Sequence, residues 1–154
     1  MIFADGSSRG NPGDGGWAVI RVEEDKLVEA MGQQLPQVTN NQMELTAILE
    51  ALKEYGVDES EFTYPILYSD SKYSINTYTN WMFNWANNNW TKSDKKAPLN
   101  LDIIKEFYDL WVNKGKRLDI RWIKGHSGDR WNNLVDAIAT GKINLDKDLK
   151  GEIE

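Results

Sequence analysis

The chain of 154 residues contains no cysteine, a single histidine and only four prolines. Without cysteine there is no disulfide framework, no thiolate nucleophile and no metal site built from sulfur ligands. No apolar run approaches the roughly 20 residues that a membrane-spanning helix needs. No secretory leader precedes the first predicted strand, so we expect a cytoplasmic protein with no membrane partner.

Positive charge is also scarce, because 18 basic residues face 24 acidic ones and the net charge is -6. Such a balance usually argues against a nucleic-acid partner, which Lys and Arg would have to bind. The charge is uneven, however. Residues 90–124 carry a net charge of +4 and the remainder carries -10. This basic sector is either a local phosphate contact or an ordinary solvated surface.

The spacing of apolar residues along the chain is typical of strands in some segments and of helices in others. We predict strands over residues 2–5, 17–22, 28–35, 66–69 and 118–123. Helices are predicted over residues 40–55, from the Asp70-Ser71 cap to Thr79, and over 81–88, 100–112 and 131–140. This order favours an α/β fold with a mixed sheet and helices packed on its faces. A single domain is expected over residues 1–141, followed by a charged C-terminal tail, 142–154.

Four carboxylates, Asp5, Glu44, Asp70 and Asp136, lie where a predicted strand ends or beside the apolar stripe of a predicted helix. If the first and fourth strands are neighbours, Asp5 and Asp70 project at the same edge of the sheet. Taken singly, each acid could be a cap, a turn residue or a surface charge. Converging together they would repel unless a cation neutralised them, which predicts a site for Mg²⁺.

The residues around these acids form five motifs in order along the chain. They are DGS with GNPG (residues 5–13), TNNQMEL (39–45), YSDS (68–71), WIKGHSG (122–128) and NNLVD (132–136). Together they resemble the type 1 ribonuclease H family from residue 1 to about residue 140. The resemblance implies the ribonuclease H-like fold, a five-stranded mixed sheet of three antiparallel strands followed by parallel strands, with helices on both faces.

The resemblance also implies an endoribonuclease that hydrolyses the RNA strand of an RNA/DNA hybrid and leaves 5′-phosphate and 3′-hydroxyl ends. In this interpretation Asp5, Glu44, Asp70 and Asp136 hold two Mg²⁺ ions, with Mn²⁺ as a possible substitute. Two cations can neutralise the phosphodiester and both of its in-line oxygens. His126 is given an auxiliary role in proton transfer or product release, and the enzyme is expected to act as a monomer.

Substrate contacts are implied at three groups of residues. Asn11, Asn40 and Asn41 match positions that line the RNA strand, although asparagine is equally suited to turns and caps. Thr39 and Asn100 match a pocket for a phosphate of the DNA strand. Gln37 occupies the position where an arginine often completes that pocket, which predicts weaker binding of the phosphate.

Residues 81–90 resemble the substrate-binding protrusion of the family. Trp81, Trp85 and Trp90 either lie against deoxyribose or pack the helices to the body of the protein. The stretch carries asparagines where many bacterial members carry basic residues, and fewer phosphate contacts predict lower affinity and a shallower salt dependence.

Two other functions remain compatible with the same fold. One is an inactive module that binds hybrids, which would be expected to lose at least one of the four acids. The other is a nuclease or strand-transfer enzyme that acts on DNA. The Asn40-Asn41 pair ahead of Glu44 and the loop at His126 speak against it.

Overall fold

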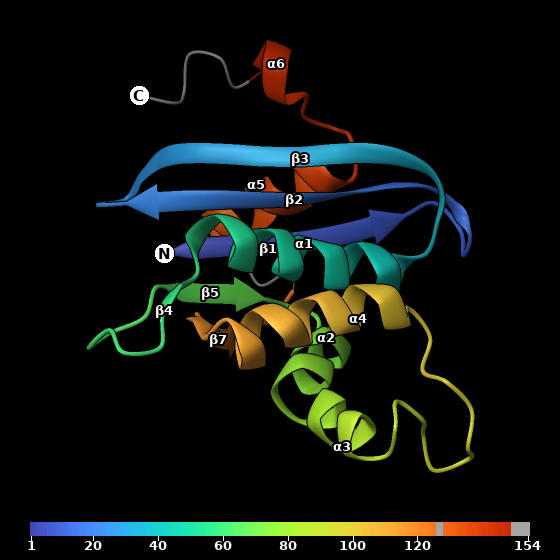
Figure 1. The fold of residues 1–154 in the computed structure, drawn as a ribbon. Coiled ribbons are helices and arrows are strands. Elements are labelled where there is room, and N and C mark those ends of the chain that lie inside the picture. Colours follow the sequence, from blue (N-terminus) through green and yellow to red (C-terminus); the bar gives the residue numbers. More distant parts are fainter. Residues whose placement is uncertain (126–127, 149–154) are drawn as a thin grey trace.

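The computed structural model describes residues 1–125 and 128–148. Its centre is a five-stranded sheet in the order β3-β2-β1-β5-β7 (Figure 1). The strands are β1 (Ile2–Ser8), β2 (Gly13–Glu23), β3 (Lys26–Val38), β5 (Ile66–Ser69) and β7 (Asp119–Trp122). The first three pair antiparallel, whereas β5 runs parallel to β1 and β7 runs parallel to β5. The predicted mixed sheet is therefore confirmed.

Helices cover both faces of this sheet, α1 and α4 on one face and α5 on the other (Figure 1). The helical elements are α1 (Asn40–Tyr55), α2 (Lys72–Asn76), η1 (Thr77–Trp81), α3 (Met82–Asn87), α4 (Leu101–Tyr108), η2 (Asp109–Asn113), α5 (Arg130–Ala139) and α6 (Leu145–Asp148). A small second sheet, which was not predicted, pairs β4 (Val57–Asp58) with β6 (Lys116–Arg117).

The two cores follow from the alternation of side chains along the central strands. On β1, Ile2 and Ala4 face the core beneath α1, whereas Phe3 faces the core beneath α5. On β2, Val19 belongs to the first core and Ile20 to the second. Because successive side chains of a strand point to opposite faces, near-continuous apolar runs mark strands that are covered on both sides.

Helix α1 has the bounds that its sequence predicts. The Thr39 hydroxyl accepts a hydrogen bond from the backbone N–H of Gln42 (3.1 Å), and the Gln42 side chain accepts one from the Thr39 N–H (3.3 Å). This capping box satisfies two N–H groups that a helix start would otherwise leave without partners. The helix ends at Tyr55, before Gly56.

The helices expected over residues 70–79 and 81–88 differ from the structure, because α2, η1 and α3 follow one another without a break. The π-helical turn η1 brings Tyr78 inward, where its ring stacks on Phe107 (centroids 3.7 Å apart). The expected helix 100–112 similarly divides into α4 and the π-helical η2. In the region expected to be a tail, Ile143 and Leu145 pack against the core beneath α5.

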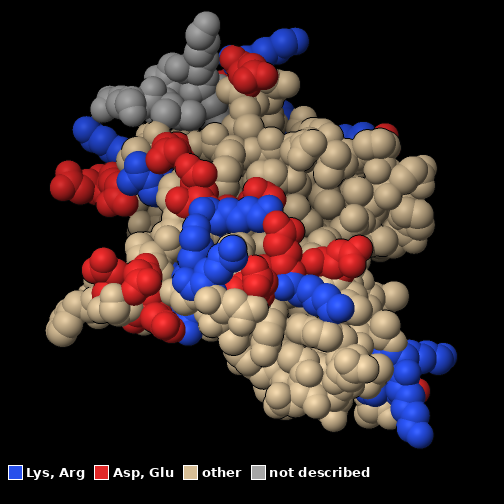
Figure 2. All heavy atoms as spheres, in the orientation of Figure 1, with Lys and Arg blue, Asp and Glu red and all other residues tan. Residues whose placement is uncertain are grey.

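Acidic and basic side chains alternate over the middle of the face shown in Figure 2. Ion pairs include Arg21 with Glu29 (2.9 Å) and Lys53 with Glu106 (2.6 Å). A separate group of basic side chains lies at the tip of the loop that follows α3 (Figure 2). Within residues 1–125 and 128–148, no helix is both long enough and apolar enough to cross a membrane.

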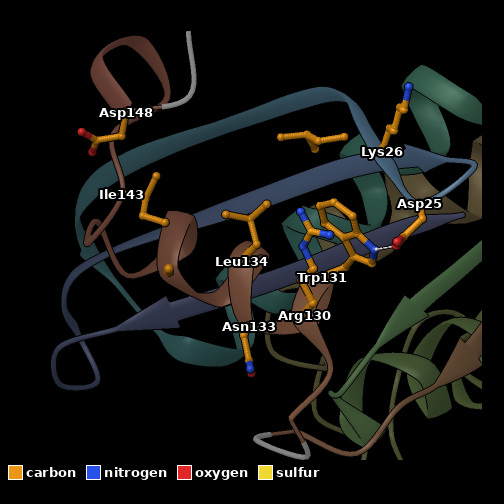
Figure 3. Close-up of a pocket in the computed structure, with 10 residues that line it drawn as sticks. Asp25, Lys26, Arg130, Trp131, Asn133, Leu134, Ile143 and Asp148 are labelled. Atoms are coloured by element: carbon orange, nitrogen blue, oxygen red, sulfur yellow. Dashed lines mark hydrogen bonds between the residues drawn. The ribbon is translucent and has the colours of Figure 1, made fainter. Parts of the chain in front are cut away.

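A hollow of about 680 Å³ lies between α5, the β2–β3 turn and α6 (Figure 3). Leu27, Leu134 and Ile143 contribute apolar lining. On the same side, the Trp131 indole N–H donates a hydrogen bond to Asp25 Oδ1 (3.2 Å; Figure 3). This bond joins the start of α5 to the β2–β3 turn.

We expect Tyr78→Phe to lower the free energy of unfolding by about 1 kcal/mol, the usual contribution of a buried hydrogen bond. The buried Tyr78 hydroxyl donates to the carbonyl of Leu45 (2.8 Å) and thereby ties η1 to α1. Urea denaturation of both proteins measures the change.

Tyr64→Phe is the matched control, because the Tyr64 hydroxyl donates to the Glu59 carbonyl (2.7 Å) at an exposed position. It should change stability by less than Tyr78→Phe. Equal effects of the two substitutions would contradict the role assigned to the buried bond.

Candidate active site

The first two carboxylates are brought together by the parallel pairing of β1 and β5. Phe3 lies opposite Tyr68 in the register of these strands. Asp5 is two residues beyond Phe3, and Asp70 is two residues beyond Tyr68. Both acids therefore reach the same level at the carboxyl edge of the strands, as the sequence predicts.

Helix α1 brings Glu44 to the same place because it packs directly on Gly6 of β1. A Cβ atom at position 6 would lie 2.2 Å from the Met43 carbonyl carbon and 2.3 Å from the Glu44 amide nitrogen. Only glycine permits this approach. A glycine inside a strand pattern signals a close backbone contact, so this role was readable from the sequence but was not predicted.

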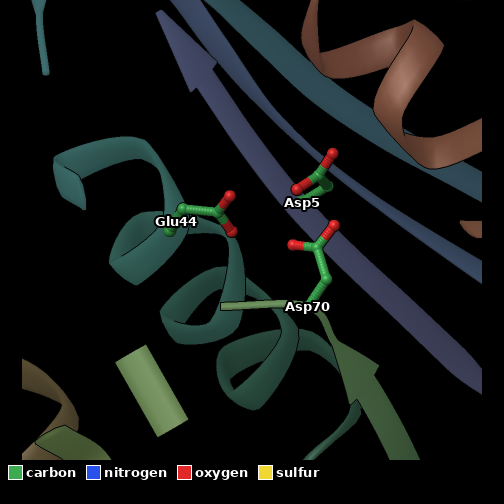
Figure 4. A group of neighbouring side chains, drawn as sticks. All are labelled: Asp5, Glu44 and Asp70. Atoms are coloured by element: carbon green, nitrogen blue, oxygen red, sulfur yellow. The ribbon is translucent and has the colours of Figure 1, made fainter. Parts of the chain in front are cut away.

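Asp5, Glu44 and Asp70 converge, with one carboxylate oxygen of each within 4.8 Å of the others (Figure 4). Asp5 is 2% exposed and Glu44 is 6% exposed. Burial raises the pKa of Asp5 far above its ordinary value, and the nearby charges of Glu44 and Asp70 raise it further. Burial also raises the pKa of Glu44, with an added contribution from the charge of Asp70. These shifts show that the protein alone does not compensate the clustered charges.

The donor set fits a divalent cation. Glu44 Oε2 is buried and has no hydrogen-bond partner among the residues that the structure describes. A buried carboxylate oxygen without a partner is costly, and a cation ligated there would remove that cost. Carboxylate oxygens are also the ligands that hard divalent cations prefer.

The fourth acid, Asp136, lies beside this cluster rather than within it. It is half-buried on α5, and its carboxyl approaches Asp5 closely enough to contribute to the raised pKa of that residue, after burial and the charges of Glu44 and Asp70. The group of three oxygens within 4.8 Å does not include it. Asp136 therefore borders the cluster on the side of α5.

Asn11 and Asn40 lie next to each other at the rim. Asn11 Oδ1 accepts hydrogen bonds from the Asn40 backbone N–H (2.8 Å) and from the Ser8 hydroxyl (3.0 Å). Asn40 and Asn41 are exposed at the start of α1, and their side chains make no hydrogen bond within the described ranges. Their amides are thus available to a ligand, while Asn11 also has a local structural role.

Thr39 and Asn100 are caps in the structure. The Thr39 hydroxyl caps α1, and Asn100 adopts a left-handed backbone conformation (φ 60°) directly before α4. Among the described residues, no hydrogen bond joins their side chains. Gln37 also has a positive φ, 53°.

The tryptophans of the protrusion divide into two groups. Trp81 and Trp85 line a hollow of about 660 Å³ together with Lys92 and Lys95. Trp90 packs edge-to-face on Tyr108 of α4 (centroids 5.1 Å apart). Trp90 and Trp85 both pack against the core beneath α1, whereas only Trp81 and Trp85 line the hollow.

His126 lies outside the described residues, so its predicted role stays a prediction. The preceding Gly125 is described, and a Cβ atom there would lie 2.8 Å from Asp70 Oδ2. Glycine at this position lets the chain pass close to the Asp70 carboxylate.

Comparison with known proteins gives consistent results. The family model for RNase H matches residues 1–144. The chain is 37% identical over 152 residues to a ribonuclease H of Alcanivorax borkumensis, covering 99% of this chain and 96% of that protein. It is 41% identical over 143 residues to a ribonuclease H of Caldanaerobacter subterraneus subsp. tengcongensis, covering 92% and 89% of the two chains.

Solved structures have the same fold. The crystal structure of LC9-RNase H1, a type 1 RNase H with the type 2 active-site motif, matches with a TM-score of 0.71 and 25% identity over 90% of this chain and 68% of that one. LC11-RNase H1, solved in complex with an RNA/DNA hybrid, matches with a TM-score of 0.60 and 21% identity over 92% and 96% of the chains.

We expect Asp5→Asn to raise the stability of the metal-free protein by roughly 2 kcal/mol above about pH 4, because asparagine avoids the cost of burying a carboxyl group that is ionised in the unfolded chain. The folded protein holds a proton on Asp5 to higher pH than the unfolded chain does, since the folded pKa is raised. Stability of the original protein therefore falls as pH rises above the unfolded pKa of an aspartate, about 4.

Thermal unfolding in EDTA at pH 5 and pH 8 measures this prediction. The advantage of Asp5→Asn should be larger at pH 8. In Mg²⁺ the stability difference between the two proteins should shrink or change sign, because Asp5→Asn lacks a ligand and is stabilised less by the cation. A variant that is less stable than the original protein in EDTA at both pH values would refute the expectation.

Proposed function

The chain belongs to the ribonuclease H family, and we propose that Asp5, Glu44, Asp70 and Asp136 hold the divalent cations with which it works. The protein is an endoribonuclease that hydrolyses the RNA strand of RNA/DNA hybrids and leaves 5′-phosphate and 3′-hydroxyl ends. A two-metal-ion mechanism is the norm of this family. The convergence of three buried carboxylates carries the residue assignment.

We infer that the cations are two Mg²⁺ ions per site, with Mn²⁺ as a substitute. Asp5, Glu44 and Asp70 supply oxygen ligands from a rigid frame of two strands and a helix, and Asp136 supplies another from α5. When bound, the cations neutralise charge on the phosphodiester and on its attacking and leaving oxygens.

The chain's own groups bind and orient the substrate around this centre. Of the two site acids that lie on helices, Asp136 is more exposed than Glu44. Its carboxylate is therefore suited to accept a hydrogen bond from a water molecule in the site. Burial of Asp5 and Glu44 keeps water from their carboxylates and strengthens their electrostatic interactions. His126 is assigned the auxiliary transfer of a proton near the products, which imidazole can perform close to neutral pH.

Recognition of RNA is assigned to the asparagines at the rim. Amide groups can both donate to and accept from a 2′-hydroxyl, the group that distinguishes RNA from DNA. The exposed amides of Asn40 and Asn41 have no partner within the described ranges. Asn11 fixes the Asn40 main chain (2.8 Å) and so couples the β1–β2 loop to the start of α1.

We assign the DNA strand to the protrusion and to a pocket near Thr39 and Asn100. The hollow bordered by Trp81 and Trp85 combines aromatic faces with Lys95, a combination that suits a sugar-phosphate backbone. Lys92 in the same hollow is 3.6 Å from Asp94, which offsets part of its charge. This supports the expectation of weaker electrostatic binding of the hybrid.

We expect Asp70→Asn to lower hybrid cleavage in Mg²⁺ by at least roughly 100-fold, because loss of a direct ligand should cost more than the 10- to 100-fold typical of outer-shell partners. A labelled RNA/DNA hybrid and a duplex DNA of the same sequence serve as substrates, and only the hybrid should be cut. Asp119→Asn changes an exposed acid paired with Arg121 and should keep full activity. Undiminished cleavage by Asp70→Asn would exclude the proposed site, and cleavage of duplex DNA at an equal rate would favour the DNA-acting alternative.

We expect Asn41→Ala to lower kcat/KM on the hybrid about tenfold, the value of one well-placed hydrogen bond, with little change in thermal stability. Hybrids with a single 2′-deoxy substitution at each ribose near the cut identify the contacted hydroxyl. On the hybrid that lacks this hydroxyl, Asn41→Ala and the original protein should have the same kcat/KM. Asn113→Ala on η2 is the control and should match the original protein on every hybrid. If no single 2′-deoxy position removes the difference, Asn41 does not read a 2′-hydroxyl.

A further inference from the structure

Trp122, at the end of edge strand β7, is unusual in being both exposed and hydrogen-bonded. Trp122 is 46% exposed. Its indole N–H nevertheless donates a hydrogen bond to the main-chain carbonyl of Asp70 (3.2 Å). A large aromatic side chain is thus kept at the surface, where it gains little from burial, with its one polar atom directed at a residue of the carboxylate cluster.

A second contact holds the ring in this position. The Lys72 ammonium nitrogen lies 4.5 Å from the centroid of the Trp122 ring. A cation over an indole face at this distance is a favourable cation–π arrangement. Both contacts of the ring are therefore made to the same short segment, from Asp70 to Lys72, where the chain leaves β5 and enters α2.

The Asp70 carboxylate itself has no such support. Within residues 1–125 and 128–148, no protein group donates a hydrogen bond to its oxygens. Its direction therefore depends on the main chain that carries it, and Asp70 lies just beyond the last residue of β5. Asp5 and Glu44 differ, because they lie inside a strand and a helix.

The segment 122–125 hydrogen-bonds this main chain at two points and passes close to the Asp70 carboxylate. The Ile123 N–H donates to the Ser69 carbonyl (2.9 Å), and the Trp122 indole holds the next carbonyl, that of Asp70. Gly125 passes so close to Asp70 that a Cβ atom there would lie 2.8 Å from Oδ2. Of these contacts, only the one from Trp122 is made by a side chain, and substitution can remove it selectively.

We propose that Trp122 is a positioning residue that orients the Asp70 carboxylate for cation binding. The proposal rests on the proposed function only in taking Asp70 as a cation ligand. Trp122 acts through the Asp70 main chain and makes no direct contact with the cation or the reacting atoms. Lys72 holds the indole plane over the turn so that its N–H remains directed at the Asp70 carbonyl.

Trp122→Phe tests this directly, because it removes the N–H donor and keeps a smaller aromatic face for Lys72. Calorimetric titration of the free protein with Mg²⁺ measures cation affinity without any reaction. We expect affinity for Mg²⁺ to fall about three- to tenfold, as loss of one hydrogen bond would cause. In hybrid cleavage, the Mg²⁺ concentration for half-maximal rate should rise by a similar factor, while KM for the hybrid at saturating Mg²⁺ stays within about twofold.

Trp131→Phe is the matched control. The Trp131 indole N–H donates to Asp25 at the same distance, 3.2 Å, but this bond joins the start of α5 to the β2–β3 turn and does not involve Asp70 (Figure 3). This substitution should lower thermal stability and leave Mg²⁺ affinity unchanged. A purely structural role for Trp122 would give the same pattern, so the two variants separate positioning from general stability.

Trp122→Leu removes the ring and its N–H together and should weaken Mg²⁺ binding at least as much as Trp122→Phe. Unchanged Mg²⁺ affinity in a folded Trp122→Phe protein would overturn the proposal, and so would an equal loss in Trp131→Phe. Failure of the intact protein to cleave a hybrid would instead count against the proposed function. The calorimetric comparison would still decide the role of Trp122.

Discussion

The structure depends on holding several carboxylates together in a place that water scarcely reaches. Each buried charge loses solvation, and the charges also repel one another, so the arrangement is unfavourable without a cation. Both effects raise the pKa of Asp5 and the pKa of Glu44. A site of this kind persists only if the surrounding fold is rigid enough to prevent the side chains from turning away.

That rigidity comes from three elements that meet at one point. Parallel pairing of β1 and β5 sets Asp5 and Asp70 at one level, and a shift by one residue would move the side chains of β1 from one core to the other. Gly6 then allows α1 to approach β1 so closely that Glu44 enters the same space. Asp70 is the least constrained of the three, which explains why a neighbouring strand contributes an extra support to it.

Much of this could be predicted from the sequence, for identifiable reasons. Helix α1 was predicted with its observed bounds, because the polar Thr39-Asn40-Asn41 start can cap it and an apolar stripe marks its length. The position of Asp70 after a short buried strand was equally clear. Both features are local, and local patterns are what a sequence displays most directly.

The features that were missed depend on contacts between distant segments. Two separate helices were predicted over residues 70–79 and 81–88, but a π-helical turn joins them so that Tyr78 can stack on Phe107 and donate a hydrogen bond to the Leu45 carbonyl. Nothing in the local pattern shows that contact. The support of Asp70 by Trp122 is of the same kind, since 52 residues separate the donor and the acceptor. An exposed tryptophan near a strand end is common, and only its partner makes it informative.

Electrostatics decide how such a site can hold a polyanion. The chain carries a net charge of -6, and its carboxylate cluster adds local negative potential where the substrate must come closest. At physiological ionic strength, screening limits the reach of each charge to about 8 Å, so lysines of the protrusion cannot offset the cluster from a distance. A bound cation reverses the local negative potential of the cluster, and a hydrogen bond from an uncharged asparagine amide at the rim depends little on salt. Affinity and catalysis are therefore linked through the same ions, and whatever fixes Asp70 in place also supports binding of the strand that is cut.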